Sequence, residues 1–398
     1  MLAEERINKD FCLQLKSFDE EYVFITAIVT NEEGYPLDIC KNIYEEIKKF
    51  LLKYKITILQ ERIFGSLCIY EKVCSIRKEV LDSYPIEKYQ EVTNSITYLE
   101  GNPYWGQGLS GISIYGMAKS HNKNIYNVIY EDKIFGRKWE DNDAEYMILQ
   151  NIHGLKLEQE NAYQQALNMF EKANIILLNN GFTYSNIIRT WIYLHNILSQ
   201  YSEFNAARNQ KFKEFSLLPD ELSDEEFEQV YLPASTGIGC NNVYKAAGVM
   251  NIFAIKKKVN SALSIYNETG SNQKSAYRYG SAFSRSMVLD NKISKQIYLS
   301  GTASIDEFGK TAKHNDIMGQ IEKTTSVVEA LIRNENMSFD NLYEGTVFLK
   351  RKEYIKAYQE FCRLHSLKQL PCIITIADIC RNDLLFEMDA TFGGWSYS

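Results

Sequence analysis

The chain has 398 residues, of which 45% are hydrophobic, 13% aromatic and 24% charged, and this composition excludes a disordered chain and predicts a globular protein with a sizeable core. The net charge is −7, and basic residues are mixed with acidic ones throughout, so we expect no nucleic-acid partner. The charged N-terminus predicts no signal peptide, and the absence of long apolar runs predicts no membrane span. A cytoplasmic protein is therefore expected.

Cysteines and histidines give no pattern of a metal centre. The eight cysteines are scattered without a CxxC pair, and the five histidines form neither HExxH nor HxH. Thiols spread in this way are typical of reduced cytosolic proteins, in which most of them are core residues. We therefore predict neither a metal site nor a disulfide framework.

Residues 1–140 are predicted to form an N-terminal α+β region, with strands at 22–30 and 56–63 and a helix at 37–53. The stretch 98–117, YLEGNPYWGQGLSGISIYGM, holds five glycines among aromatic residues. It predicts a glycine-rich turn that leads into a strand at 111–117. The alternative is a cleft wall, because glycine lets the backbone approach a ligand closely.

Residues 141–265 are predicted to form a second α+β unit. Its expected elements are a strand at 146–152, a helix at 161–178, a strand at 186–194, a helix at 201–215, an acidic surface loop at 219–231 and a turn at 233–240. Residues 251–276 are predicted to be helical at first and then to loosen into a linker, NETGSNQKSA.

Residues 266–398 are predicted to form a third part of similar composition. Its expected elements are strands at 279–289 and 296–304, a helix at 317–333, a strand at 342–350, a helix at 352–364, and strands at 373–380 and 384–392. In the last strand Leu384, Phe386 and Met388 alternate with Glu387 and Asp389, so the carboxylates share the opposite face. On its own this pattern favours solvated edge carboxylates over a pocket.

An internal repeat relates the two later parts at an offset of 155 residues. The apolar helix positions of 166–177 fall on those of 321–332, and the strand IIRTWIYL of 187–194 falls on LYEGTVFL of 342–349. Matched helix and strand lengths predict a duplication. Two α+β units packed around a cleft are therefore expected, and such interfaces are where ligand sites concentrate.

Polar residues in these elements have two interpretations each. Arg189 shares a strand face with Tyr193, and it predicts either an interface ion pair with Glu387 or Glu344, or a clamp for a carboxylate ligand. Arg208 is either a solvated helix residue or a ligand contact. In the turn PASTGIGC, Thr236 and Gly237 either cradle an anion or belong to an ordinary loop.

Several segments together resemble the chorismatase family, a branch of the YjgF-like (reactive-intermediate deaminase) superfamily. They are EGNPYWGQGLSGISIYGM, RTWIYL, FNAARN, LPASTGIG, YGSAFSR, SGTASI and ADICRNDLLFE, spread in this order over residues 95–392. SGTAS and the terminal strands are shared with the wider superfamily, whereas RTWIYL, FNAARN and LPASTGIG with YGSAFSR are more specific. The resemblance implies two YjgF-like (chorismate-mutase-like) units after the N-terminal region.

The resemblance also implies an activity, cleavage of chorismate at its enolpyruvyl ether with release of pyruvate and without a cofactor. Glu387 stands at the position of the family's general acid, and an apolar setting would hold its pKa near the working pH. The two carboxylates of chorismate require cationic clamps. The implied substrate contacts are Arg189, Arg208, Arg285, the Thr236-Gly237 segment, Tyr193, Tyr279 and Cys380.

The implied product depends on single residues. Cys380 stands where a cysteine accompanies the hydroxybenzoate-forming branch, although it is also compatible with an ordinary buried thiol, and Ser286 stands where a smaller residue is usual. Either a 3- or 4-hydroxybenzoate or, by hydrolysis, a dihydroxy-cyclohexadiene carboxylate is therefore expected. A binding protein without catalysis is a further alternative. Imine deamination is disfavoured, because no arginine follows Pro371. The oligomeric state stays open, and the duplication is compatible with a monomer.

Overall fold

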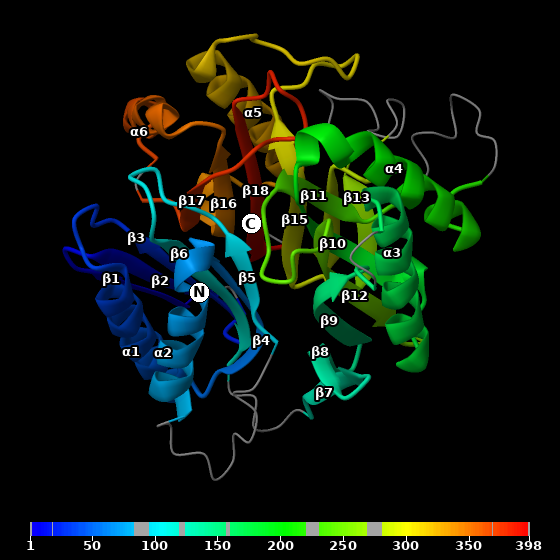
Figure 1. Cartoon of the computed structure of the whole chain (residues 1–398). Coiled ribbons are helices and arrows are strands. Elements are labelled where there is room, and N and C mark those ends of the chain that lie inside the picture. Colours follow the sequence, from blue (N-terminus) through cyan, green and yellow to red (C-terminus); the bar gives the residue numbers. More distant parts are fainter. Residues whose placement is uncertain are drawn as a thin grey trace.

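The computed structural model describes residues 2–17, 19–82, 95–118, 124–156, 160–219, 231–268, 281–367 and 369–396. These residues form three six-stranded sheets. The sheets gather around the middle of the molecule, and the helices lie outside them (Figure 1). One hydrophobic cluster takes buried residues from all three sheets, and three further clusters lie between each sheet and its own helices. The α+β class expected from the sequence is confirmed.

The first sheet has the strand order β1-β2-β3-β6-β4-β5. Its elements are β1 (Leu2–Ile7), β2 (Phe11–Ser17), β3 (Tyr22–Val29), α1 (Pro36–Tyr54), β4 (Thr57–Gly65), the 3-10 helix η1 (Leu67–Ile69), α2 (Tyr70–Asp82), β5 (Thr97–Glu100) and β6 (Leu109–Met117). Helix α1 forms because Ile39, Ile43, Ile47 and Phe50 recur at helical spacing and are buried against the sheet.

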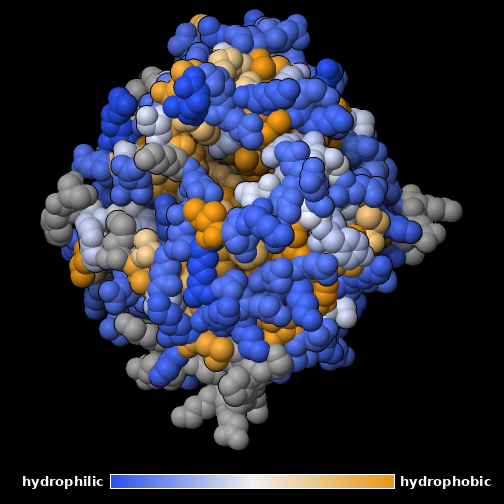
Figure 2. All heavy atoms as spheres, turned by 90° about the vertical axis from the view of Figure 1, so that its left-hand side faces the viewer, coloured by the Kyte–Doolittle hydropathy of each residue, from blue (hydrophilic) through white to orange (hydrophobic). Residues whose placement is uncertain are grey.

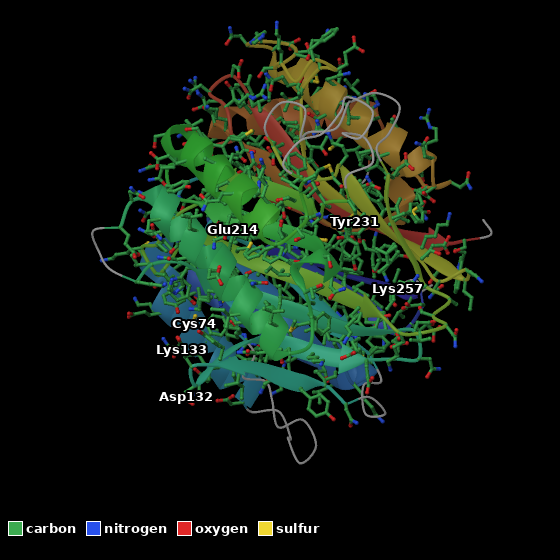
Figure 3. The ribbon with its side chains drawn as sticks, turned by 90° about the vertical axis from the view of Figure 1, so that its right-hand side faces the viewer. Cys74, Asp132, Lys133, Glu214, Tyr231 and Lys257 are labelled. Carbon is green, nitrogen blue, oxygen red and sulfur yellow. The ribbon has the colours of Figure 1, made fainter. Side chains whose placement is uncertain are left out.

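The second sheet has the strand order β11-β10-β12-β9-β8-β7. Its elements are β7 (Tyr126–Tyr130), β8 (Lys133–Glu140), β9 (Ala144–His153), α3 (Ala162–Asn179), η3 (Tyr184–Asn186), β10 (Ile187–Leu194), α4 (Ile197–Glu214), β11 (Ala234–Gly239) and β12 (Gly248–Lys257). Helix α3 begins after Asn161, whose side chain accepts a hydrogen bond from the Gln164 amide. Helices α3 and α4 lie side by side across the outer face of this sheet (Figure 3).

The third sheet has the strand order β13-β14-β15-β18-β16-β17. Its elements are β13 (Ser264–Glu268), β14 (Ser286–Asp290), β15 (Ser294–Ala303), α5 (Ile317–Arg333), η6 (Phe339–Asn341), β16 (Leu342–Leu349), η7 (Lys352–Tyr354), α6 (Ile355–Leu364), β17 (Cys372–Ile376) and β18 (Phe386–Trp395). Strand β18 lies between β15 and β16, so the carboxylates on it are not at a sheet edge.

The three sheets have the same topology. If the six strands of each sheet are numbered along the chain, their order across the sheet is first, second, third, sixth, fourth, fifth. The repeat at an offset of 155 is therefore real, because β10 and β16 coincide at that offset, as do η3 and η6. The N-terminal region is a third copy, which the sequence pattern did not reveal. Strand β8 pairs with β9, and β7 pairs with β8, so residues 126–140 lie in the second sheet although the sequence division assigned them to the N-terminal region.

Two local predictions are wrong. The segment after residue 251 is strand β12 and then β13 instead of a helix. Strand β12 lies between β9 and β10 and is buried on both faces, so it lacks the alternation that identifies a strand. The expected turn at 233–240 is strand β11, which pairs in parallel with β10. Most of the expected loop at 219–231 and linker at 267–276 lies outside the described residues.

The three central strand pairs share a bulge that allows the copies to be aligned residue by residue. Near the start of each of β4, β10 and β16, one residue is skipped in the pairing with the neighbouring strand. The skips lie between Ile58 and Gln60, Ile187 and Arg189, and Leu342 and Glu344. Four positions after these bulges lie Phe64, Tyr193 and Phe348. Their partners on the neighbouring strand are Gly111, Val249 and Glu387. A carboxylate therefore occupies only one of three corresponding positions.

Two buried ion pairs lie where the three units meet. Arg62 Nη2 on β4 is 2.9 Å from Glu344 Oε2 on β16, and Arg189 Nη2 on β10 is 3.2 Å from Asp389 Oδ2 on β18. Both guanidiniums lie over the Trp191 ring, 4.9 and 4.7 Å from its centroid. The charges balance, and they join strands from all three units.

Candidate active site

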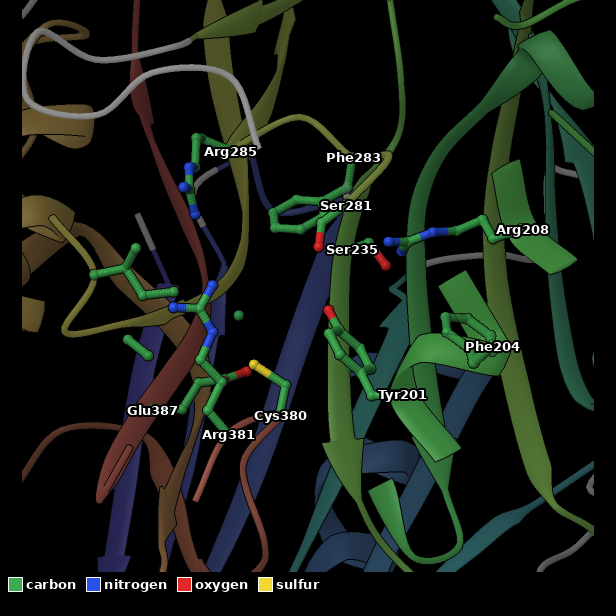
Figure 4. A pocket seen from close by; sticks show the side chains of 14 residues that line it. Tyr201, Phe204, Arg208, Ser235, Ser281, Phe283, Arg285, Cys380, Arg381 and Glu387 are labelled. Atoms are coloured by element: carbon green, nitrogen blue, oxygen red, sulfur yellow. The ribbon is translucent and has the colours of Figure 1, made fainter. Parts of the chain in front are cut away.

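A pocket lies between the second and third units, with helix α4 and strand β11 on one side and strands β15 and β18 and the segment before β14 on the other (Figure 4). Its cavity volume is about 40 Å³. The lining residues are Tyr201, Phe204, Arg208, Ser235, Gly237, Ser281, Phe283, Arg285, Gly301, Ala303, Ile305, Cys380, Arg381 and Glu387. Five of the residues predicted from the sequence are thus brought together: Arg208, Gly237, Arg285, Cys380 and Glu387.

Glu387 is the carboxyl group of this pocket. It is 4% exposed, and the alternation of β18 turns it away from the helices while Phe386 and Met388 pack beneath them. Burial raises the pKa of Glu387 to about 8, and the negative charge of Asp389 adds to the effect while the guanidiniums of Arg189 and Arg285 oppose it. Glu387 therefore holds a proton at neutral pH and can donate it.

Gly301 on β15 gives the Glu387 carboxyl its space. A Cβ atom added to Gly301 would lie 2.1 Å from Glu387 Oε1 and 3.2 Å from Thr236 Cγ2. A side chain at this position would force the carboxyl group to move, because contacts this short do not occur between non-bonded atoms. Only glycine fits at position 301, because the Glu387 carboxyl group lies so close to its backbone.

We expect the Gly301→Ala variant to fold and to lose activity, since a displaced proton donor costs roughly 100-fold in rate. The measurement is kcat for the activity that the family resemblance implies, pyruvate release from chorismate, with thermal unfolding as a check of the fold. Gly394 on β18 provides a matched control, because a Cβ there would contact only flexible side-chain ends at 3.2 Å or more. A Gly301→Ala enzyme with the parent kcat would contradict the assigned position of the acid.

Buried guanidiniums supply positive charge to the pocket. Arg208 on α4 and Arg285 before β14 are 3% and 4% exposed, and they lie 5.8 and 5.5 Å from the centroid of the Phe283 ring between them. Arg208 Nη2 donates to Asn205 Oδ1 at 2.5 Å, and within the described residues it has no carboxylate partner. Burial lowers the pKa of Arg208. This charge is available to an anionic ligand.

Cys380 and Tyr201 complete the walls beside the acid. Burial raises the pKa of the Cys380 thiol to about 12, and the nearby Glu387 adds to this, so the thiol stays protonated and is a poor nucleophile. The hydroxyl of Tyr201 points toward Ser281 and Ser235 across the pocket (Figure 4). Ser286 does not line the pocket, and its hydroxyl donates to the Glu268 carbonyl at 3.0 Å.

Other predicted residues lie behind the pocket. Arg189 is held by Asp389 and donates to Thr236 Oγ1 at 2.6 Å, and Thr236 in turn donates to Asp389 Oδ2 at 2.9 Å. The ion pair expected for Arg189 is thus present with a partner other than Glu387 or Glu344. Tyr193 is in the shared core with its ring edge against Phe64. These side chains face away because successive residues of a strand point to opposite sides.

Tyr279, predicted as a ring contact, lies outside the described residues. Sequence reasoning missed Tyr201, Phe204, Ser281, Phe283, Gly301 and Arg381. A signal existed for the first two, because Tyr201, Phe204 and Arg208 share one face of a helix at i, i+3 and i+7. The others come from loops and a strand that only the packing of two units brings together.

No set of three or more His, Cys, Asp or Glu side chains gathers as a metal site within the part of the chain that the structure describes. Among the same residues, no helix is both long and apolar enough to cross a membrane.

Comparisons with known proteins find similarity in sequence to a curated enzyme and similarity in fold to a solved structure. No family model matches the chain. A 3-hydroxybenzoate synthase from Streptomyces hygroscopicus is 26% identical over 235 residues, which cover 52% of this chain and 64% of the relative. The chain thus matches less than two thirds of that relative's length.

One solved structure is similar in fold over most of the chain. The crystal structure of a chorismatase aligns with a TM-score of 0.54 and 16% identity, covering 84% of this chain and 93% of that one. A member of the YjgF protein family from Neisseria meningitidis aligns with 34% of this chain and 98% of its own length, at a TM-score of 0.25 and 14% identity.

Proposed function

We propose that this chain, a relative of the chorismatases in fold and sequence, cleaves the enolpyruvyl ether of chorismate and releases pyruvate and a hydroxybenzoate. One observation carries the proposal: a carboxyl group with a pKa of about 8 shares a pocket with the buried guanidiniums of Arg208 and Arg285. A proton donor beside two cations suits a dianionic substrate that is activated by protonation.

The proposed reaction begins with Glu387. Its carboxyl group gives its proton to the terminal methylene carbon of the enolpyruvyl group, and the ether oxygen then shares the positive charge of an oxocarbenium ion. Burial has two effects on this step. It keeps the Glu387 carboxyl group protonated at neutral pH, and after proton transfer the resulting carboxylate stabilises the oxocarbenium ion beside it. The bond between the ring carbon and the ether oxygen then breaks, its electron pair goes to that oxygen as pyruvate leaves, and the ring loses one proton as it becomes aromatic, so the reaction balances with side chains alone.

The carboxylates of chorismate would be held by guanidiniums. Arg208 and Arg285 approach from different units and lie on either side of Phe283, and Arg381 lies on the Glu387 side of the same pocket (Figure 4). Arginine suits this role because its planar fork binds a carboxylate through two hydrogen bonds. The substrate would thus span the interface of the two units.

We expect a hydroxybenzoate in preference to a hydrolysis product, with the 3-isomer first. Support comes from the named activity of the Streptomyces relative and from Cys380, which the family resemblance associates with aromatisation. Formation of a hydroxybenzoate and pyruvate consumes no net water, whereas hydrolysis to a dihydroxy-cyclohexadiene carboxylate consumes one molecule.

The test is incubation of the purified protein with chorismate, followed by chromatography against 3-hydroxybenzoate, 4-hydroxybenzoate and the dihydroxy-cyclohexadiene carboxylate. Pyruvate is followed in parallel with lactate dehydrogenase. We expect equal amounts of pyruvate and 3-hydroxybenzoate. A diene product would shift the proposal to hydrolysis, and a raised melting temperature without pyruvate would support a binding protein and overturn the proposed activity.

The arginine clamp leads to a further prediction. The Arg208→Met variant keeps much of the apolar volume but loses the charge, so we expect KM for chorismate to rise by roughly 10- to 100-fold, because a charge-assisted hydrogen bond contributes about 1.5–3 kcal/mol. Steady-state kinetics measure it. Lys211→Met on the same helix is the control, since Lys211 pairs with Glu171 away from the pocket. An unchanged KM in Arg208→Met would remove Arg208 from the site.

A further inference from the structure

A second concave site lies between the third and first units. It is a hollow with hydrophobic walls on the face of the molecule that Figure 2 presents. The cavity volume is about 530 Å³, within the range of roughly 300–1,000 Å³ that is usual for ligand pockets. Strands β2, β3 and β17 and helix α6 contribute its walls. The lining residues are Cys12, Ile28, Thr30, Tyr358, Gln359, Cys362, Arg363, Ser366, Leu367, Gln369, Leu370, Cys372 and Ile374.

The strand registers show that this cavity corresponds to the candidate active site. In the second unit Ser235 and Gly237 on β11 pair with residues 190 and 192 of β10. At the repeat offset of 155 these become residues 345 and 347 of β16, which pair with Cys372 and Ile374 on β17. Cys372 and Ile374 therefore occupy the places of the pocket residues Ser235 and Gly237.

The opposite wall corresponds as well. Ala303, which lines the candidate active site, pairs with Glu387, and Ile28 pairs with Gly111, the residue at the position of Glu387 in the first unit. Ile28 thus stands in the place of Ala303. The same crevice between neighbouring units has been retained at a second interface, with different side chains.

The side chains that line the second crevice are mostly apolar. Gly111 takes the place of the acid, and thiols and aliphatic side chains take the place of the hydroxyl and glycine wall. The one arginine at the cavity, Arg363, is exposed and is paired with Glu360 at 2.6 Å, so it offers little net charge to an anion. This cavity therefore lacks both features that suit the proposed substrate of the first.

We propose that this second crevice, formed by β2, β3, β17 and α6, is a binding site for a small aromatic molecule with at most one polar group. Cys362 is partly exposed and gives a sulfur atom that makes a favourable contact with an aromatic ring, and Tyr358 and Leu367 offer apolar surface beside it. The polar groups of Thr30, Gln359 and Gln369 can orient a single hydroxyl.

The probe for this site is 4-fluorophenol, observed by ¹⁹F NMR with the full-length protein. We expect saturable binding, and we expect the Leu367→Trp and Thr30→Trp variants, which fill the cavity from two sides, to weaken it at least about tenfold. Leu364→Trp on the same helix is the matched control, since Leu364 is exposed and does not line the cavity. Two filling variants are used so that one misfolded protein does not decide the result.

Competition separates this site from the candidate active site. In the Glu387→Gln variant, chorismate at saturating concentration is expected to leave the fluorophenol signal unchanged. Displacement by chorismate, or equal binding by parent and both filling variants, would overturn the proposal, because the probe would then occupy another place. Absence of saturable binding to the parent protein would also overturn it. None of these outcomes depends on whether chorismate is turned over.

Discussion

The Glu387→Gln variant is expected to release pyruvate from chorismate roughly 10²- to 10⁴-fold more slowly than the parent enzyme, the usual contribution of a general acid. The amide has nearly the shape of the protonated carboxyl group but cannot give up a proton at neutral pH. Substrate binding should persist, because the guanidiniums of Arg208 and Arg285 are unchanged. The lactate dehydrogenase assay measures kcat, and thermal stabilisation by chorismate reports binding.

A second buried glutamate provides the control for this variant. Glu335 is 8% exposed and pairs with Lys295 at 2.7 Å, far from the pocket in the fold. The Glu335→Gln variant is expected to lose some stability and to keep its kcat. If Glu387→Gln turned over chorismate at the parent rate, another group would have to deliver the proton, and the mechanism proposed for this pocket would be wrong.

The repeat of the second and third units could be predicted from the sequence, whereas the first unit could not be identified as a further copy. The second and third units keep their helix and strand lengths, so β16 follows β10 at a constant offset of 155. The first unit has the same order of strands and helices, but β4 follows α1 without the 3-10 helix that stands before β10 and β16, and its spacing differs. Apolar patterns are tied to spacing, whereas sheet order depends on pairing between distant segments, and a single sequence does not display that pairing.

The strand pattern predicted which face Glu387 lies on but not which residues surround it. Alternation placed Glu387 and Asp389 on one side of the last strand, and the structure confirms it. The difference between them arises from neighbours on other units, because Asp389 is held by Arg189 and Thr236 whereas Glu387 meets the backbone of Gly301. Those partners lie more than 80 residues away, so the strand alone could not separate a structural carboxylate from a proton donor.

Burial of Glu387 also predicts how the stability of the folded protein depends on pH. The unfolded chain ionises near the ordinary carboxyl value of 4.5, and the folded chain keeps its proton up to about pH 8. Below pH 4.5 both states hold the proton, and the group contributes no difference. Between pH 4.5 and 8 only the unfolded state gains from ionisation, so the free energy of unfolding falls as pH rises, and above pH 8 the loss is complete.

The size of this loss is on the order of 3–5 kcal/mol for a pKa raised from 4.5 to about 8. Urea unfolding at pH 5, 7 and 9 measures it, and the difference between the parent and Glu387→Gln removes the contribution of every other titrating group. We expect Glu387→Gln to gain stability relative to the parent as pH rises. Activity should follow the same proton, so kcat stays level below pH 8 and falls about tenfold per pH unit above it. A parent-to-variant difference that is constant from pH 5 to 9 would mean that Glu387 ionises like an exposed carboxyl group, and such a group would be a carboxylate at neutral pH with no proton to give.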